Sequence, residues 1–114
     1  MVQLLAKLIA PQEGVPELVR ALRAVMWGAR QARGCSFASV YLSGTEELSV
    51  AYLEEWHDAH ELRRQFGSER FVQLLALLET AAERPVVEFR VISATYGLEY
   101  ITTPDEVEQA GWKT

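Results

Sequence analysis

The stretch from residue 34 to residue 56, GCSFASVYLSGTEELSVAYLEEW, constrains the fold of this chain more than any other. Residues 35–42 and 48–56 both alternate with the period of a β-strand. The sequence Ser43-Gly44-Thr45 between them is typical of a tight turn. We therefore predict two long strands that pair as an antiparallel hairpin.

A strand and a helix are predicted before this hairpin. Residues 2–10 alternate, and one side of that strand is wholly apolar. Residues 14–33 follow, with apolar side chains at the spacing of an amphipathic helix. Pro16 lies near the first turn of this helix, and Gly34 is the residue that ends it.

A second helical segment and a last strand are predicted after the hairpin. Asp58 and Glu61 have the spacing of a capping box, and the helical turn that follows ends at Gly67. Residues 68–82 carry an apolar stripe at helical spacing, with Ser68 as the cap. Residues 86–96 alternate again and are predicted to form the last strand.

The element order, strand–helix–strand–strand–helix–strand, predicts an α+β fold of the ferredoxin-like βαββαβ type. In this fold a four-stranded antiparallel sheet carries both helices on one face. We assign residues 1–100 to this domain and residues 101–114 to a C-terminal tail. Within the tail, Thr103-Pro104-Asp105-Glu106 reads as a capping box that starts a short helix, ending near Ala110.

The sheet face turned away from the helices is predicted to bind a second copy of the chain. Several large aliphatic side chains lie on it among polar ones: Leu5, Ile9, Leu53 and Ile92. Two helices cannot cover both faces, so we predict a homodimer with the sheets packed face to face. Trp27, on the opposite side of the first helix, is either a surface residue covered by Arg23 and Arg30 or a contact with another chain.

Composition excludes several other classes of partner. The net charge of −5 argues against nucleic acid, because phosphate binding needs a basic surface. No apolar run approaches the ~20 residues that span a bilayer, so we expect no membrane partner and a cytoplasmic protein. The one cysteine, Cys35, cannot form an intrachain disulfide, and we interpret it as a small buried hydrophobe rather than a reactive thiol.

Several short motifs resemble a known family. They are Arg33-Gly34-Cys35, Val40-Tyr41-Leu42, Glu55-Trp56 and the run from residue 62 to 71. On these motifs, residues 2–96 resemble the antibiotic biosynthesis monooxygenase domain family of the dimeric α+β barrel superfamily. Glu54, Trp56 and Phe71 match its pattern, whereas Gln65 stands where many members have a His.

The resemblance implies a chemistry. Known enzymes of the family oxidise aromatic polyketides or quinols with dioxygen, without metal or flavin, and others degrade haem. The haem-degrading branch has an Asn on the first strand, a Trp in the middle connection and a His on the last helix. This chain has no Asn in the first strand, Phe66 in the Trp position and no His in residues 71–82. We therefore expect no metal and no cofactor.

A cofactor-free oxygenase must hold an electron-rich aromatic substrate, deprotonate it and exclude water. We predict four catalytic residues for that task, which are Tyr52, Glu54, Trp56 and His57. We predict three substrate-binding residues, which are Tyr41, Phe66 and Phe71. Filling of the core is the commoner role for aromatic side chains at such spacing.

The charged candidates have alternative interpretations. Glu54 on an apolar side either pairs with an arginine at the sheet rim or faces a pocket, because an unpaired buried carboxylate is costly. His57 and His60 have poor spacing for a metal site. A basic cluster at the same end is either a solvated face or supplies one contact to an anionic substrate, and its members are Arg63, Arg64 and Arg70.

The sequence therefore supports two functions. The first is a cofactor-independent monooxygenase-like protein acting on a small aromatic or quinol compound. The second is a non-catalytic dimeric module of the same fold that binds a small ligand or another protein. A cavity of ~300 Å³ or more with a polar group on its wall would favour the first.

Overall fold

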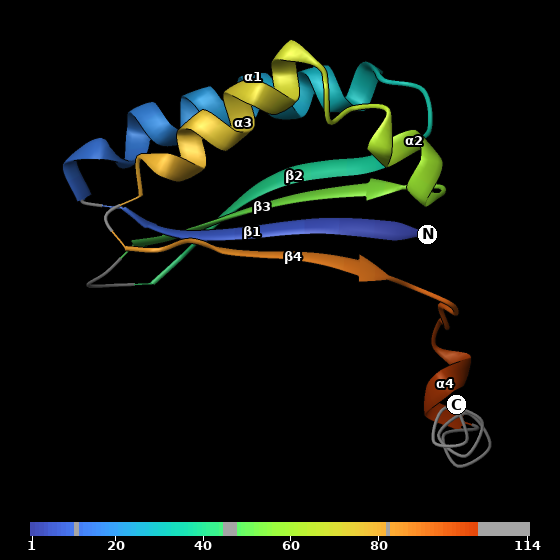
Figure 1. Cartoon of the computed structure of the whole chain (residues 1–114). Coiled ribbons are helices and arrows are strands. Elements are labelled where there is room, and N and C mark those ends of the chain that lie inside the picture. Colours follow the sequence, from blue (N-terminus) through green and yellow to red (C-terminus); the bar gives the residue numbers. More distant parts are fainter. Residues whose placement is uncertain (11, 45–47, 82, 103–114) are drawn as a thin grey trace.

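The computed structural model describes residues 1–10, 12–44, 48–81 and 83–102 of the chain. It has one antiparallel sheet with a layer of helices on one face (Figure 1). The four strands are β1 (Val2–Ala10), β2 (Cys35–Ser43), β3 (Leu48–Trp56) and β4 (Val86–Val91). The predicted α+β ferredoxin-like fold is confirmed.

The sheet has the order β2-β3-β1-β4, so β1 lies between β3 and β4. β1 pairs with β3 from Val2 opposite Trp56 to Ala10 opposite Leu48. β2 pairs with β3 from Cys35 to Ser43, as the hairpin pattern predicts, with one irregularity between Cys35 and Phe37. Because the side-chain period of a strand is two, this register fixes which residues face the helices.

The helix layer consists of α1 (Val15–Gln31), preceded by a 3-10 turn η1 (Gln12–Gly14), and of α2 (Ala59–Arg63) and α3 (Glu69–Glu79). All three α-helices lie on the same side of the sheet (Figure 1). The core forms where α1 and α3 meet the inner sides of β1 and β3, and its largest fully buried apolar side chains are Leu4, Leu8, Leu22, Val50, Tyr52 and Leu74.

Both predicted caps after the hairpin are confirmed. Asp58 Oδ1 accepts a hydrogen bond from the Glu61 backbone N–H at 2.8 Å, and Ser68 Oγ accepts one from the Phe71 N–H at 3.2 Å. Each cap satisfies a backbone donor that the first turn of a helix leaves unpaired. The caps fix where α2 and α3 begin and so position the side chains that follow them.

The last strand is shorter than predicted, because it ends at Val91 rather than at residue 96. β4 is an edge strand paired only with β1, and Val91 lies opposite Val2, the first residue of β1. Beyond the strand, the Ile92 N–H donates a hydrogen bond to the Met1 carbonyl oxygen at 2.9 Å. The chain then leaves the sheet and forms α4 (Glu99–Thr102), which lies beyond β4, away from the helix layer (Figure 1). The helix predicted from Thr103 to Ala110 lies outside the described residues.

Trp27 lies exposed on the outer side of α1, as its position in the helix predicts. The guanidinium carbon of Arg30 lies 4.8 Å from the centre of the Trp27 ring. Arg30 Nε also donates to the Ala38 carbonyl oxygen at 2.9 Å, so the side chain is held between α1 and β2. None of the described helices is long and apolar enough to cross a membrane.

Candidate functional site

The inner side of β3 brings together three of the four predicted catalytic residues. Tyr52, Glu54 and Trp56 alternate along the strand, and all three are fully buried under the helices. Among the described residues, Glu54 is the one charged residue that is buried. Its carboxylate therefore needs partners inside the protein.

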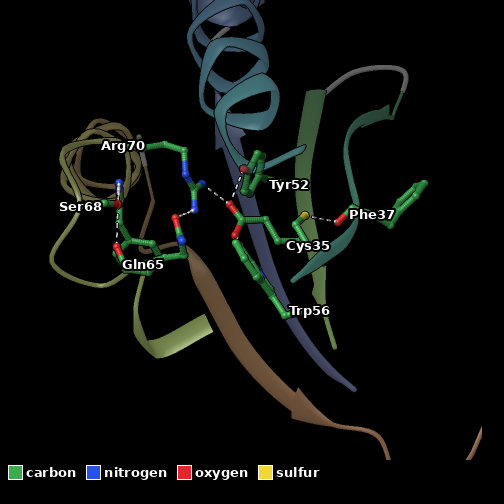
Figure 2. A network of polar contacts seen from close by, with 9 residues as sticks. Cys35, Phe37, Tyr52, Trp56, Gln65, Ser68 and Arg70 are labelled. Atoms are coloured by element: carbon green, nitrogen blue, oxygen red, sulfur yellow. Dashed lines mark hydrogen bonds and ion pairs between the residues drawn. The ribbon is translucent and has the colours of Figure 1, made fainter. Parts of the chain in front are cut away.

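Glu54 has three such partners. Its Oε1 accepts a hydrogen bond from Trp56 Nε1 at 3.0 Å, and its Oε2 accepts one from the Tyr52 hydroxyl at 2.5 Å. Arg70 Nη1 donates to the same Oε2 at 2.6 Å, and Arg70 Nη2 donates to Gln65 Oε1 at 3.1 Å. Figure 2 shows Arg70 reaching from α3 towards β3, with Gln65 beside its guanidinium. We call these five residues the Glu54 network.

The Glu54 network joins the helix layer to the sheet through a buried ion pair. The Arg70 side chain is only 13% exposed, and Glu54 is not exposed at all. The guanidinium carbon of Arg70 also lies 5.9 Å from the centre of the Trp56 ring. Gly28 on α1 leaves room for this arrangement, since a Cβ there would lie 2.7 Å from Arg70 Cδ.

Within the Glu54 network the hydrogen-bond donors and the carboxylate acceptor satisfy one another. Burial, and then the neighbouring Glu54 carboxylate, raises the pKa of Tyr52 well above its ordinary value. Tyr52 is therefore a neutral hydrogen-bond donor rather than a phenolate. Among the described residues, every buried side-chain nitrogen and oxygen has a hydrogen-bond partner.

A cleft of about 530 Å³ lies in front of the Glu54 network, between β4 and the helices α2 and α3. Its walls are almost entirely apolar, and they are formed by Val2, Ala59, Leu62, Arg63, Phe66, Phe71, Leu75, Phe89 and Val91. Three rings form an aromatic cluster on these walls. The centre of the Phe66 ring lies 5.0 Å from that of Phe71 and 5.9 Å from that of Phe89.

The cleft is open because the helices do not cover β4. Every residue of β4 is exposed, including those on the inner side of the sheet. Phe89, which points towards the helices by its register with Leu4, is still 51% exposed. Behind the cleft, Trp56 packs with Val2 and Leu62, so the cleft wall separates the Glu54 network from the opening.

The other predicted site residues are divided between these regions. Phe66 and Phe71 line the cleft. Tyr41 lies opposite Ala51 on the far face of the sheet, half exposed, and does not line the cleft. His57 is exposed directly after β3, and its backbone N–H donates to the Gly34 carbonyl oxygen at 2.9 Å.

Two features of the site were not assigned from the sequence. Phe89 was not among the predicted substrate-binding residues, although it is one of the aromatic residues available for a pocket and alternation in the last strand placed it on the same side as Val87 and Val91. Arg70 could not be separated from Arg63 and Arg64, because all three were assigned to one basic cluster at the same end of the molecule. No local pattern distinguishes the arginine that crosses to the sheet.

Two other kinds of chemistry, metal binding and thiol catalysis, were compared with the side chains of the described residues. No group of three or more His, Cys, Asp or Glu side chains within it could hold a metal ion. Burial raises the pKa of the Cys35 thiol, and Cys35 Sγ lies 3.4 Å from the Phe37 carbonyl oxygen. A raised thiol pKa disfavours the nucleophilic thiolate.

The fold matches those of several solved proteins. Two of them, from Deinococcus radiodurans and Nitrosomonas europaea, carry the name "putative antibiotic biosynthesis monooxygenase". The first has a TM-score of 0.75 at 16% identity and covers 86% of this chain and 98% of its own. The second has a TM-score of 0.71 at 8% identity, with coverage of 84% and 93%. This chain has the antibiotic biosynthesis monooxygenase-like fold.

That fold is shared by proteins whose names state no activity. A conserved protein from Methanosarcina mazei has a TM-score of 0.66 at 23% identity and covers 78% of this chain and 89% of its own. No family model matches the sequence, and no curated protein matches it significantly. The antibiotic biosynthesis monooxygenase-like fold is therefore established here by the path of the backbone.

Proposed function

We propose that this chain is a cofactor-independent monooxygenase-like protein that binds a small aromatic or quinol compound in the cleft. The observation that carries the proposal is the cleft itself, an apolar space of about 530 Å³ with three phenylalanine rings on its walls. Its volume lies within the ~300–1,000 Å³ that small-molecule sites usually have. The names of the two solved proteins with the same fold support the same reaction class.

The reaction needs no resident electron donor, because the substrate supplies the electrons. In such a step a methylene carbon between aromatic rings becomes a carbonyl while dioxygen gives one oxygen atom to it and one to water. We propose that Phe66 and Phe71 hold the substrate rings. The catalytic roles of Tyr52, Glu54, Trp56 and His57 stay predictions.

The experiment for this function is oxygen uptake by the purified protein with a panel of anthrones and quinols. Turnover above the buffer rate for one compound, lost when Leu75 is replaced by Trp to fill the cleft, is the expected result. Leu75 lines the cleft and is itself partly exposed, so the larger side chain should not disturb the core. No turnover with any compound would contradict the proposal.

A non-catalytic ligand-binding protein is the second candidate, and one observation favours it. The buried polar residues of β3 bind one another and lie behind the cleft wall, so they do not face a ligand. Arg63 is the one ionisable residue among those described that line the cleft. Binding of an anthrone or a quinol without oxygen uptake would support this candidate over the first.

We also propose that the protein is a homodimer through the sheet face opposite the helices. Leu5, Ile9 and Leu53 are only partly covered there, and Phe37 and Tyr41 are exposed. The face also carries charges of both signs, from Lys7 and Arg90 and from Glu55 and Glu88, so two copies related by a two-fold axis can pair opposite charges.

The dimer proposal is tested by replacing Leu53 with Glu and measuring the mass in solution at micromolar concentration. The expected result is a dimeric native protein and a monomeric variant, since the new carboxylate would be buried without a partner. Trp27→Ala is the matched control on the helix side and should leave the mass unchanged. A monomeric native protein would contradict the proposal.

A further inference from the structure

The three arginines at the α2 end of the molecule differ in how their charges are neutralised. Arg70 is paired with Glu54 at 2.6 Å inside the Glu54 network. Arg64 lies 3.5 Å from Glu61, an ion pair within one helical turn. Arg63 lines the cleft, and no ion pair or hydrogen bond of its guanidinium is found among the described residues.

Arg63 is therefore a cation on the wall of an otherwise apolar cleft. The remaining walls come from aliphatic and phenylalanine side chains, which offer no hydrogen bond to a polar ligand group. A guanidinium binds a carboxylate or another oxyanion through two parallel N–H donors, and such charge-assisted hydrogen bonds are stronger than those between neutral groups. Arg63 itself is exposed, so an anionic group would meet it at the opening of the cleft while the apolar body of the ligand lies against the walls.

From this contrast we propose that the ligand of the cleft is a hydrophobic monoanion with a planar apolar body and one anionic oxygen group held by Arg63. The apolar body would contact the Phe66, Phe71 and Phe89 rings, and the anionic group would lie at the α2 side of the opening. This inference rests on the proposed binding function, and it narrows the ligand class.

Because the protein carries a net negative charge, an anionic ligand would depend on the local contact with Arg63. With a net charge of −5, the chain as a whole repels anions, so long-range attraction does not bring such a ligand to the surface. Recognition must come from the one local cation and from burial of the apolar body. A neutral compound of the same shape would keep the burial and lose only the charge-assisted hydrogen bonds.

The test compares two probes that have the same shape and differ in charge, 2-naphthoate and the neutral 2-naphthamide, by titration calorimetry on the full chain. We expect the native protein to bind the carboxylate at least about tenfold more tightly, as a charge-assisted pair implies. In Arg63→Gln the two dissociation constants should become similar, while Arg63→Lys should keep part of the preference. Arg64→Gln, next in sequence but paired with Glu61, is the matched control and should retain the native preference.

Two outcomes would overturn the proposal in distinguishable ways. Equal binding of both probes by the native protein, or a preference that survives Arg63→Gln, would remove Arg63 as the anion site and leave the binding function standing. Failure of both probes to bind the native protein would overturn the inference together with the ligand site on which it rests. Arg63 is exposed, so its substitution should not impair folding, and circular dichroism of each variant checks this.

Discussion

The Glu54 network and the cleft lie on two sides of the same wall, and they differ in whether their polar side chains have partners within the protein. In the network, a buried carboxylate receives three donors, and the arginine that neutralises it is itself held by Gln65. In the cleft, the walls are apolar and the one arginine on them has no partner among the described residues. The comparison separates side chains that hold the fold together from side chains that are free to meet a ligand.

This difference also bears on how Tyr52, Glu54 and Trp56 on β3 are interpreted. A tyrosine, a glutamate and a tryptophan on one side of a strand suggest an active site when only the sequence is considered. In the structure Tyr52 and Trp56 each donate a hydrogen bond to Glu54, and Glu54 also pairs with Arg70, so these contacts join α3 to the sheet. Stability should therefore depend on the Glu54 network, and ligand affinity should depend on the cleft.

The largest effect is expected when the buried carboxylate is removed. Glu54→Ala leaves the largely buried Arg70 charge without its carboxylate, with only the neutral Gln65 bonded to it, so the free energy of unfolding should fall by about 3–5 kcal/mol. Urea denaturation measures this, and Glu54→Gln, which keeps the shape, serves if the alanine variant does not fold. Glu55→Ala is the control, because the one hydrogen bond of the Glu55 side chain among the described residues is partly buried and comes from Gln3, so its loss should cost about 1 kcal/mol. Equal losses at both positions would contradict the central role of Glu54.

A smaller loss is expected when the space beside Arg70 is filled. Gly28→Ala places a Cβ 2.7 Å from Arg70 Cδ, and Arg70 cannot move away without lengthening its bonds to Glu54 and Gln65. The variant should lose about 1–3 kcal/mol of unfolding free energy, in spite of the better helix propensity of alanine. Gly67→Ala, where no atom lies within 4 Å of the new Cβ, should be neutral or slightly stabilising. A stabilised Gly28→Ala variant would show that Arg70 is not held in place.

In the cleft the effects should be on affinity rather than on stability. Phe89→Ala removes an edge ring that is half exposed, so the free energy of unfolding should change by about 1 kcal/mol or less. Affinity for 2-naphthoate should fall about tenfold, since an aromatic contact with the ligand is lost. Tyr41→Ala on the opposite sheet face should leave that affinity unchanged. A Phe89→Ala variant that binds as the native protein does would place the ligand elsewhere.

The smallest effect concerns the alkaline limit of stability. The pKa of Tyr52 is raised in the folded protein, so above about pH 10 the unfolded chain loses this proton while the folded protein keeps it. Stability should then fall with rising pH, by up to about 1.4 kcal/mol per pH unit for this one group. Urea unfolding between pH 9 and 11 should give a shallower decline for Tyr52→Phe than for the native protein. Identical slopes would mean that Tyr52 ionises freely in the folded state.

The sequence predicted the elements and their order because the signals for them are local. Alternation gave β1, β2 and β3, helical spacing gave α1 and α3, and Asp58 and Ser68 were recognised as caps before any contact was known. The same alternation placed Tyr52, Glu54 and Trp56 on one side of a strand. Each of these inferences uses residues fewer than about ten positions apart.

Only the tertiary structure decided what those residues do. The end of β4 at Val91 depends on how β4 pairs with β1, the strand beside it. The choice of Arg70 over Arg63 and Arg64 depends on how α3 lies across the sheet. The cleft exists because the helices leave β4 uncovered. These are distances between segments far apart in the chain, set by the packing of helices on a sheet. Local periodicity says which way a side chain points, whereas only packing determines what it meets.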